Sequence, residues 1–227
     1  MLRKRNKRIV FQYGEVIHVI TRGYSGNMKI TNLREIVQTY HFSVEQLKAA
    51  QSSTKMKEFF SLSGSVCLDC PLQNGGCYTH KYPQFMGFTS LLRAIHPGEI
   101  KTLQEVFDDV VKLCRGQYVR FGTFGEPVLL GLELVSAMCA AAKSWTGYTH
   151  QWAKNPGFAP YFHASVETIG SAFLAEANGF KYYLATTEQL PGVVVCPASK
   201  ESGRKTVCSS CKLCRGASGK NIQIKFH

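Results

Sequence analysis

The segment "FHASVETIGSAFLAEANGFKYYLAT" (residues 162–186) indicates how this chain folds. The runs at 162–168 and 181–186 are typical of strands, and the residues between them have the spacing of a helix that ends at Gly179. A strand, a helix and a second strand in immediate succession are the unit of a parallel sheet. The segment therefore predicts one βαβ unit.

The same alternation continues on both sides of this unit. Strand patterns occur at 118–127, 146–152, 192–199 and 222–226, and helical patterns at 98–116 and 128–144. A series of such units is typical of a complete or partial β/α barrel. A doubly wound sheet is the alternative, because no phosphate-binding fingerprint fixes the strand order. We expect an α/β fold with a largely parallel sheet.

The N-terminal part of the chain has a different pattern. Residues 8–22 are β-branched and aromatic around Gly14, which predicts a strand or hairpin, and 24–30 have the composition of a turn. Two helices are expected within 31–51, the second beginning at Ser43.

A segment rich in Gly, Pro and Cys, residues 61–85, follows these elements and is expected to be a loop. We therefore divide the chain into a basic N-terminal segment, residues 1–60, with a strand or hairpin and helices, and a Cys-rich β/α domain, residues 61–227. The two are expected to form one compact domain overall.

The charge of the chain favours an anionic partner. Lys and Arg number 27 against 15 Asp and Glu, a net charge of +12, and the basic residues gather in the first eight positions and around the C-terminal cysteines. Nucleic acid or a nucleotide is the partner that we expect. No apolar run is long enough to cross a membrane, and the basic N-terminus lacks the apolar region of a secretory signal. A cytoplasmic location is therefore expected, in which clustered cysteines stay reduced.

Four of the nine cysteines lie in "VVVCPASKESGRKTVCSSCKLCRG" (193–216), at Cys196, Cys208, Cys211 and Cys214. A Cys-x2-Cys-x2-Cys run with a distant Cys-Pro is the ligand pattern of a [4Fe–4S] cluster. Zn²⁺ is the alternative, although zinc sites more often use two separated Cys-x2-Cys pairs. Thiols that bind no metal are the third interpretation.

A second group consists of Cys67, Cys70 and Cys77, with His80 three residues on. Three thiolates and a histidine would satisfy zinc. Three thiolates alone would leave one iron of a cluster open for a substrate or for S-adenosylmethionine. The Cys-x2-Cys-x6-Cys spacing differs from the Cys-x3-Cys-x2-Cys of radical S-adenosylmethionine enzymes, which counts against that assignment. Cys114 and Cys139 lie on apolar helical faces and are expected in the core.

Polar residues gather where the strands are expected to end, which in β/α folds is the edge that carries active sites. We expect catalytic or acid–base roles for Glu126, His150 and Glu167. Ligand-binding roles are expected for Tyr148, Gln151, Ser199 and Lys200. The alternative is that these ends are polar because they meet solvent.

Several stretches together resemble a known but uncharacterised protein family encoded by bacteriophages and plasmids. They are "SGNMK", "CLDCPLQNGGCY", "VRFGTFGEP", "WTGYTHQW", "HASVET" and "VCPASKESGRKTVCSSCKLCRG". The resemblance covers residues 22–227 and implies a mobile-element origin and the cytoplasm of a host, but no activity. A Cys-rich loop ahead of β/α units also resembles, more distantly, the partial barrel of radical S-adenosylmethionine enzymes, in architecture alone.

Two hypotheses about function follow. In the first, the protein is a cluster-dependent enzyme acting on nucleotides or nucleic acid, with Cys67, Cys70 and Cys77 holding a catalytic centre beside the strand ends. In the second, both cysteine groups are structural, with zinc or a cluster, and the basic surface binds DNA or RNA without catalysis.

Overall fold

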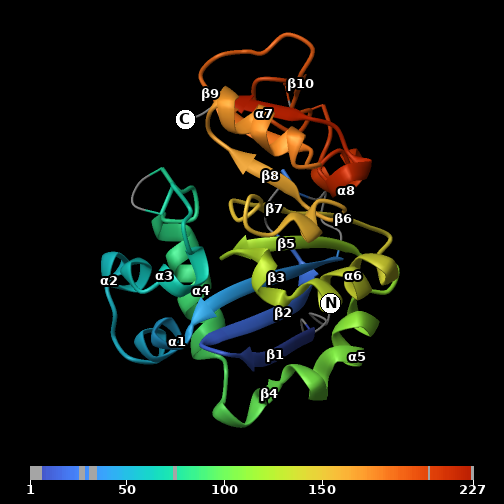
Figure 1. Cartoon of the computed structure of the whole chain (residues 1–227). Coiled ribbons are helices and arrows are strands. Elements are labelled where there is room, and N and C mark those ends of the chain that lie inside the picture. The colour runs from blue at the N-terminus through green and yellow to red at the C-terminus, as the bar shows by residue number, and fades with distance from the viewer. Residues whose placement is uncertain (1–6, 26–28, 31–34, 74–75, 204, 226–227) are drawn as a thin grey trace.

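The computed structural model describes residues 7–25, 29–30, 35–73, 76–203 and 205–225. They form a mixed α/β fold with two sheets (Figure 1). The basic residues before position 7, residues 26–28 of the expected turn at 24–30 and residues 31–34 of the first expected helix lie outside the described residues. Within the described part, no helix has the length and apolar character needed to cross a membrane.

The first sheet contains six strands in the order β4-β1-β2-β3-β5-β6. These are β1 (Lys7–Tyr13), β2 (Val16–Tyr24), β3 (Glu35–Ser43), β4 (Ile100–Thr102), β5 (Tyr118–Phe124) and β6 (Ser144–Thr146). Strands β1, β2 and β3 are antiparallel, and β4, β5 and β6 join them in parallel. The turn between β1 and β2 places Gly14 at φ +58°, in the left-handed region that glycine enters freely, so the expected hairpin is confirmed.

The prediction of a helix ahead of Ser43 is wrong, because Glu35–Ser43 forms β3. This strand pairs with β2 along its whole length, from Val16 opposite Ser43 to Tyr24 opposite Glu35. Its β-branched and aromatic residues suit a pleated, half-buried surface. The helix expected after it is confirmed as α1 (Val44–Gln51), with Ser43 and Gln46 forming a capping box.

The second sheet has five strands, all parallel, in the order β10-β11-β9-β8-β7. These are β7 (Tyr148–Thr149), β8 (His163–Val166), β9 (Tyr182–Thr186), β10 (Val194–Val195) and β11 (Ile222–Lys225). Every strand pair that the structure describes after residue 117 is parallel, which confirms the largely parallel sheet. Gly147 alone separates β6 from β7, so the chain passes directly from one sheet into the other. Neither sheet closes on itself among the described strands.

Three helices cover one face of both sheets. They are α5 (Leu103–Cys114), α6 (Leu132–Ala141) and α7 (Ile169–Ala177) (Figure 1). Their apolar residues share one core with Phe121 of β5, Val166 of β8 and Leu184 of β9, and Cys114 and Cys139 are buried in this core as expected. Helix α5 begins at Leu103, later than the helical pattern at 98–116, because Ile100–Thr102 pairs with β1 as β4.

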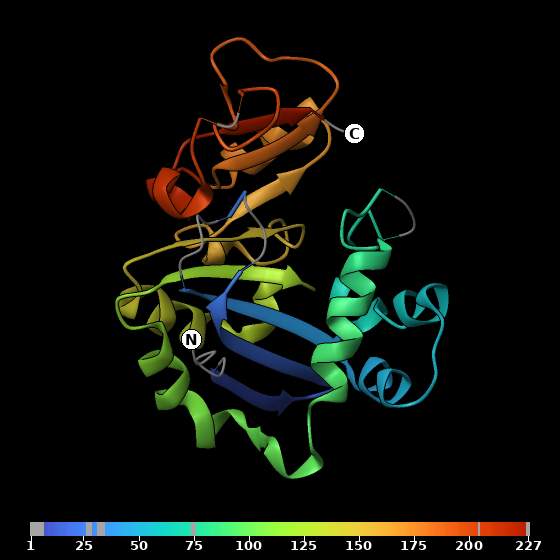
Figure 2. The same cartoon turned by 180° about the vertical axis from the view of Figure 1, so that it is seen from behind.

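The other face of the first sheet packs against helices from the segment between β3 and β4. These are α1, α2 (Met56–Ser61), α3 (Gly64–Cys67) and α4 (Tyr82–Arg93) (Figure 2). The sequence predicted α1 but not α2, α3 or α4; the expected loop at 61–85 contains α3 and the start of α4. Phe42 of β3, Phe88 of α4 and Phe124 of β5 form the centre of this second core, with ring centroids 4.9–5.7 Å apart.

Side-chain alternation along the parallel strands defines an inner face, turned away from α5, α6 and α7. On β5, Val119 and Phe121 point into the core beneath these helices. Successive strand residues point to opposite sides, so Tyr118 and Arg120 point to the inner face. By the same rule the inner face includes Thr146, Tyr148, Ser165 and Tyr183. The candidate site lies on this face and along its edge.

Candidate functional site

Glu126, His150 and Glu167 meet where three parallel strands end. Each follows its strand directly or after one residue: Glu126 after β5, His150 after β7 and Glu167 after β8. The His150 Nδ1 lies 3.2 Å from Glu126 Oε1, and its Nε2 lies 2.9 Å from Glu167 Oε1. The imidazole thus bridges two carboxylates, and the three residues that the sequence placed at strand ends form one constellation.

The deeper carboxylate of this constellation is fixed by further hydrogen bonds. The Thr149 hydroxyl donates to Glu126 Oε2 at 2.6 Å, and the His150 amide donates to Glu126 Oε1 at 3.2 Å. The side chain of Glu126 is 7% exposed, whereas that of Glu167 is 25% exposed. Glu126 therefore holds the histidine from within the protein, and Glu167 forms the side of the constellation that is open to a ligand.

The environment favours the protonated form of His150. Burial by itself lowers the pKa of the imidazole, but hydrogen bonds with Cys70, Glu126 and Glu167 raise it to about 12. Both ring nitrogens then donate, one to each carboxylate, which a neutral imidazole cannot do. The constellation is therefore an imidazolium between two acids.

The loop that contains Cys67, Cys70 and Cys77 docks against this constellation. The Glu126 amide donates to the carbonyl of Val66 at 2.8 Å, and Lys154 forms an ion pair with Asp69. Burial is the main cause that raises the pKa of the Cys67 thiol to about 12, and Cys70, Cys77 and Glu126 raise it further. Cys70, Cys77 and Glu126 are thus near enough to Cys67 to affect its pKa.

His80, expected as a fourth ligand beside these cysteines, has a different environment. Its ring stacks on Phe60 with centroids 4.2 Å apart, and its Nε2 is buried without a hydrogen-bond partner among the described residues. Burial lowers its pKa, which keeps the ring neutral. The Cys77 thiol instead contacts the Thr79 hydroxyl at 3.0 Å.

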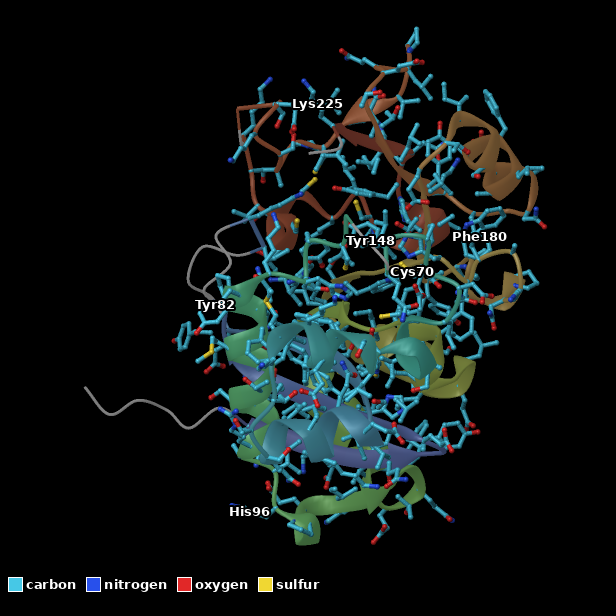
Figure 3. All side chains as sticks on the ribbon, turned by 90° about the vertical axis from the view of Figure 1, so that its left-hand side faces the viewer. Cys70, Tyr82, His96, Tyr148, Phe180 and Lys225 are labelled. Atoms are coloured by element: carbon cyan, nitrogen blue, oxygen red, sulfur yellow. The ribbon has the colours of Figure 1, made fainter. Side chains whose placement is uncertain are left out.

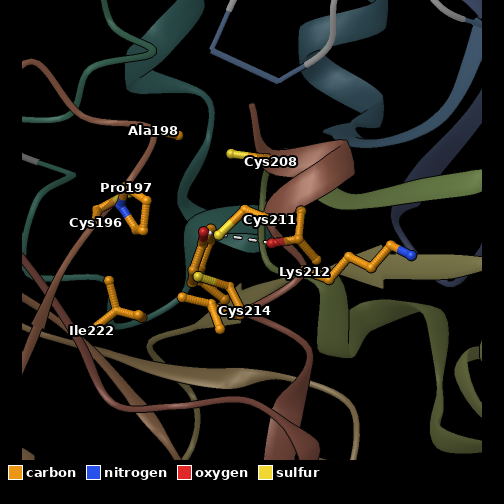
Figure 4. Close-up of a pocket in the computed structure, with 11 residues that line it drawn as sticks. Cys196, Pro197, Ala198, Cys208, Cys211, Lys212, Cys214 and Ile222 are labelled. Carbon is orange, nitrogen blue, oxygen red and sulfur yellow. Dashed lines mark hydrogen bonds between the residues drawn. The ribbon is translucent and has the colours of Figure 1, made fainter. Parts of the chain in front are cut away.

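The four C-terminal cysteines line a single small pocket (Figure 4). Cys208 and Cys211 are the first and last residues of α8 (Cys208–Cys211), and Lys212, at φ +60°, reverses the chain so that Cys214 returns to the same place. Cys196 follows β10 and is held by its amide, which donates to the Gln223 carbonyl of β11 at 2.9 Å. The sequence grouping of these four residues is thus reproduced in space.

The pocket disfavours free thiolates. Burial is the main cause that raises the pKa of Cys208 to about 11, and the neighbouring Cys196 and Cys211 thiols raise it further; the pKa of Cys214 is raised for the same reasons. A buried group of thiols titrates together only when a cation offsets the charge, which is the role of a metal centre. Within the described residues, no three Cys, His, Asp or Glu side chains stand as ligands to a single ion. Thiolate ligands are used both by iron–sulfur clusters and by zinc, so the four cysteines around this pocket do not by themselves distinguish the two.

The residues expected to bind a ligand divide between the two places. Tyr148 lines the cysteine pocket, hydrogen-bonds with Cys214 and packs on Tyr183 with ring centroids 4.6 Å apart. Gln151 is buried beside the carboxylate constellation, and its side-chain nitrogen has no partner among the described residues. Ser199 is buried and Lys200 is exposed just after the pocket.

The inner face connects the two cysteine groups. Tyr148 contacts the C-terminal group and His150 the N-terminal group, although only Thr149 separates them. Figure 3 shows Cys70 and Tyr148 in the layer between the strands of the first and second sheets. The hydroxyl of Tyr78, which follows Cys77, lies close enough to Tyr183 to contribute to raising the pKa of Tyr183, after burial and the C-terminal cysteines. Residues of the same region thus interact with both cysteine groups.

Arg120, at the middle of this face, was not singled out from the sequence. Its Nη2 donates to the Tyr78 hydroxyl at 2.9 Å, which joins β5 to the N-terminal cysteine loop. The sequence "YVRFG" (118–122) could have indicated it, because Arg120 alternates with the core positions Val119 and Phe121 and so points to the opposite face of the strand. A partly buried arginine side chain needs a hydrogen-bond or ion-pair partner, and the partner of Arg120 is the hydroxyl of Tyr78.

Comparison of the chain with protein-family models, with curated proteins and with solved structures gave no match. The geometry of the two cysteine groups and of the constellation between Glu126 and Glu167 is therefore the basis on which function is argued.

Proposed function

We propose that this protein is a metal-cluster-dependent enzyme that acts on a nucleotide or nucleic acid. The observation that carries the proposal is the docking of the Cys67–Cys77 loop on the Glu126–His150–Glu167 constellation, at the edge where three parallel strands end. A structural cysteine knuckle requires no buried imidazolium between two acids. A catalytic centre does require acid and base groups beside the reactive group.

In this proposal Cys196, Cys208, Cys211 and Cys214 hold a [4Fe–4S] cluster, and Cys67, Cys70 and Cys77 hold a second centre. Such clusters supply one-electron transfer when bound. Tyr148, beside Cys214, and the nearby His150, beside Cys70, are the chain's own link between the two. The two open sheets, joined at Gly147, are in this reading the wall of a partial barrel of the kind that the radical S-adenosylmethionine enzymes use.

The residues of the constellation have distinct tasks in the proposed reaction. Glu126 orients His150, because it accepts from Thr149, from the His150 amide and from the imidazole. His150 holds a proton beside Glu167. Glu167 is the most exposed of the three, and it passes that proton to or from the substrate. The most buried residue, Glu126, therefore has an orienting role, and the most exposed, Glu167, exchanges the proton with the substrate.

The nucleotide or nucleic-acid substrate is supported by charge. The net charge is +12, and Lys200, Lys205, Lys220 and Lys225 are exposed around the C-terminal cysteine pocket. Cationic side chains beside a reaction centre attract and orient phosphate esters.

The test compares turnover with affinity. Anaerobically purified, dithionite-reduced protein is incubated with ribonucleotides, deoxyribonucleotides, DNA and RNA, each with and without S-adenosylmethionine, and products are found by mass spectrometry. We expect a product that disappears with Glu126→Gln and with His150→Ala, while nucleic-acid affinity at fixed salt stays unchanged. Ser218→Ala, an exposed change far from the constellation in sequence, is the control that keeps full turnover.

The opposite result identifies the non-catalytic alternative. If no substrate changes and DNA or RNA affinity falls steeply with added salt, independently of sequence, the protein binds phosphates through its basic surface and the enzyme proposal is wrong.

A further inference from the structure

A groove between α4 and the first sheet combines aromatic rings with polar side chains. It has a volume of about 900 Å³, which is within the size range of sites for small organic ligands. Residues of β1, β2 and β3 form its floor, and α4 forms a wall. The Tyr40 and Phe88 rings in its lining meet edge to face, with centroids 6.1 Å apart, and Tyr24 lines it with 62% of its surface exposed. The groove therefore offers ring surfaces to a flat ligand.

The charged side chains of this groove neutralise each other. Among the described residues that line it, Arg8 and Glu99 are the charged ones. The Arg8 Nη2 donates to both carboxylate oxygens of Glu99, at 2.7 Å each. An anion or a cation would have to compete with this ion pair, whereas an uncharged ligand would not. The groove thus favours a neutral ligand.

Two residues that line the groove each have a buried polar atom without a hydrogen-bond partner in the described ranges. These atoms are Oγ1 of Thr123, near the end of β5, and Oε1 of Gln84, in α4. Buried polar groups of native proteins are nearly always paired, so an unpaired one indicates a partner that is still to bind. The Tyr40 hydroxyl differs, because it has hydrogen bonds with the side chains of Thr21 and Gln38.

The two unpaired atoms have complementary hydrogen-bonding capacities. A threonine hydroxyl donates one hydrogen bond and accepts others, whereas the Oε1 of Gln84 only accepts. Thr123 is 8% exposed, and rotation about its Cα–Cβ bond by one staggered position exchanges its hydroxyl with its methyl group, so either group can face the groove. A ligand edge that carries both donors and acceptors would pair with Thr123 and Gln84 together.

We propose that the groove between α4 and the first sheet binds a nucleobase, either of a free nucleoside or of a single strand. A nucleobase is an uncharged flat ring with donors and acceptors along one edge, which matches the neutral charge, the aromatic rings and the unpaired atoms of the groove. Thr123 and Gln84 pair with the edge of the base, and Tyr24 and Tyr40 contact its face. That the base belongs to a substrate rests on the proposed function; that the groove binds it does not.

Equilibrium binding to the full-length protein tests this inference. Adenosine, cytidine and uridine are titrated by calorimetry at one ionic strength, beside ribose 5-phosphate, which has the sugar and the charge but no base. Single-stranded DNA hexamers of dA, dC and dT are the polymer probes. We expect saturable binding of at least one nucleoside, and none of ribose 5-phosphate, if the groove takes a free nucleoside. Binding of a hexamer alone, with the dependence on Thr123 given below, identifies a base of a strand instead.

Variants of the two unpaired residues make the test specific. Thr123→Val replaces the hydroxyl by a methyl group of similar size and should weaken the preferred probe at least about fivefold, as expected for the loss of one hydrogen bond. Thr123→Ser keeps the hydroxyl and should bind within about twofold of wild type. Gln84→Met should also weaken binding, which gives a second reading if Thr123→Val does not fold. Thr187→Val, the same change at an exposed position outside the groove, should leave binding unchanged.

Unfolding of the protein without ligand separates a binding role of Thr123 from a structural one. Because its hydroxyl has no partner among the described residues, Thr123→Val should not lower the free energy of unfolding in urea. A clear loss of stability, equal affinity of wild type and Thr123→Val for the probes, or no binding of any nucleoside or hexamer would overturn the inference. Because no turnover is measured, binding without activity would reject the proposed enzyme and leave this site standing.

Discussion

At the residue scale, the interior of the first sheet contains a histidine pair that should make the protein sensitive to acid. His18 and His41 are fully buried, with their Nδ1 atoms 2.9 Å apart, and the Thr39 hydroxyl lies 3.3 Å from His41 Nε2. One Nδ1 must donate and the other accept, so the two rings cannot both be protonated on both nitrogens. Burial lowers the pKa of His18 to about 3, and burial together with His18 lowers that of His41 well below 6.5.

Because both folded pKa values are depressed, the unfolded chain binds more protons below about pH 6.5, and stability is lost as the pH falls below that value. Each histidine contributes a slope of about 1.4 kcal/mol per pH unit. His18→Phe, which keeps a ring against Phe11, should reduce the slope of the unfolding free energy by about that amount between about pH 6 and pH 4. Urea unfolding at several pH values measures it. An unchanged slope would show that His18 is already charged in the folded protein.

Gly125 is a second residue on which the site depends, since it directly precedes Glu126. Its φ is +74°, and a Cβ at this position would lie 2.8 Å from the Cβ and the carbonyl of His41. Gly125→Ala therefore combines a strained backbone with a backbone clash. We expect a loss of roughly 2 kcal/mol or more in unfolding free energy, with displacement of Glu126.

Gly179→Ala is the matched comparison, because Gly179 also has a positive φ, +81°, but no atom lies within 4 Å of the added Cβ. Backbone strain alone should lower the unfolding free energy of Gly179→Ala by about 1 kcal/mol. Denaturant titration of both variants gives the difference, and equal losses would mean that the approach to His41 is not tight.

At the element scale, the start of α1 ties the first sheet to the segment that carries Cys67. The Ser43 hydroxyl accepts from the Gln46 amide at 3.0 Å and donates to the Leu62 carbonyl at 2.8 Å, in a buried setting. Thr102 caps α5 in the same way but at the surface. Ser43→Ala should lower the free energy of unfolding by about 2 kcal/mol, and Thr102→Ala by about 1 kcal/mol. The difference is expected because only Ser43→Ala also leaves the carbonyl of Leu62 without its hydrogen bond. Thermal or chemical unfolding of the pair checks the order, and a larger loss for Thr102→Ala would contradict it.

The elements that could be predicted from the sequence are those whose pattern is local. The hairpin at Gly14, the capped helix after Ser43 and the βαβ unit at 162–186 each depend on residues within one or two turns of one another. Strand β3 was mistaken for a helix because "EIVQTYHFS" becomes a strand only through pairing with β2 on one side and β5 on the other. Its β-branched and aromatic residues agree with that pairing, and the prediction gave them too little weight.

The candidate site was predictable for a similar reason. Residues at the ends of parallel strands must meet, so Glu126, His150 and Glu167 could be placed together before the fold was known. Arg120 lies in mid-strand and depends on Tyr78 from a distant loop. The separation of Tyr148 from His150 into two environments was also hidden, because β7 ends at Thr149 and His150 lies beyond the strand.

At the scale of the whole molecule, the chain is organised around the inner face. One cluster of buried side chains runs from Phe11 to Leu184 beneath α5, α6 and α7, and it holds both sheets in one body. The cysteine groups lie on the opposite side, beside Tyr148 and His150. The apolar core thus provides a rigid wall, and the reactive residues are arranged on its other surface.

The iron and sulfide content of the purified protein decides whether it binds an iron–sulfur cluster. Wild type, Cys208→Ser, Cys67→Ser and Cys139→Ser are purified without oxygen and analysed for iron, zinc and acid-labile sulfide per chain, with absorption spectra. We predict a brown wild type with broad absorption near ~400 nm and at least about four iron and four sulfide per chain, as thiolate-bound clusters give. Cys208→Ser should lose the C-terminal cluster, Cys67→Ser should keep it, and Cys139→Ser, a change in the apolar core, should match wild type. A colourless wild type, with stoichiometric zinc or with no metal, would contradict the account.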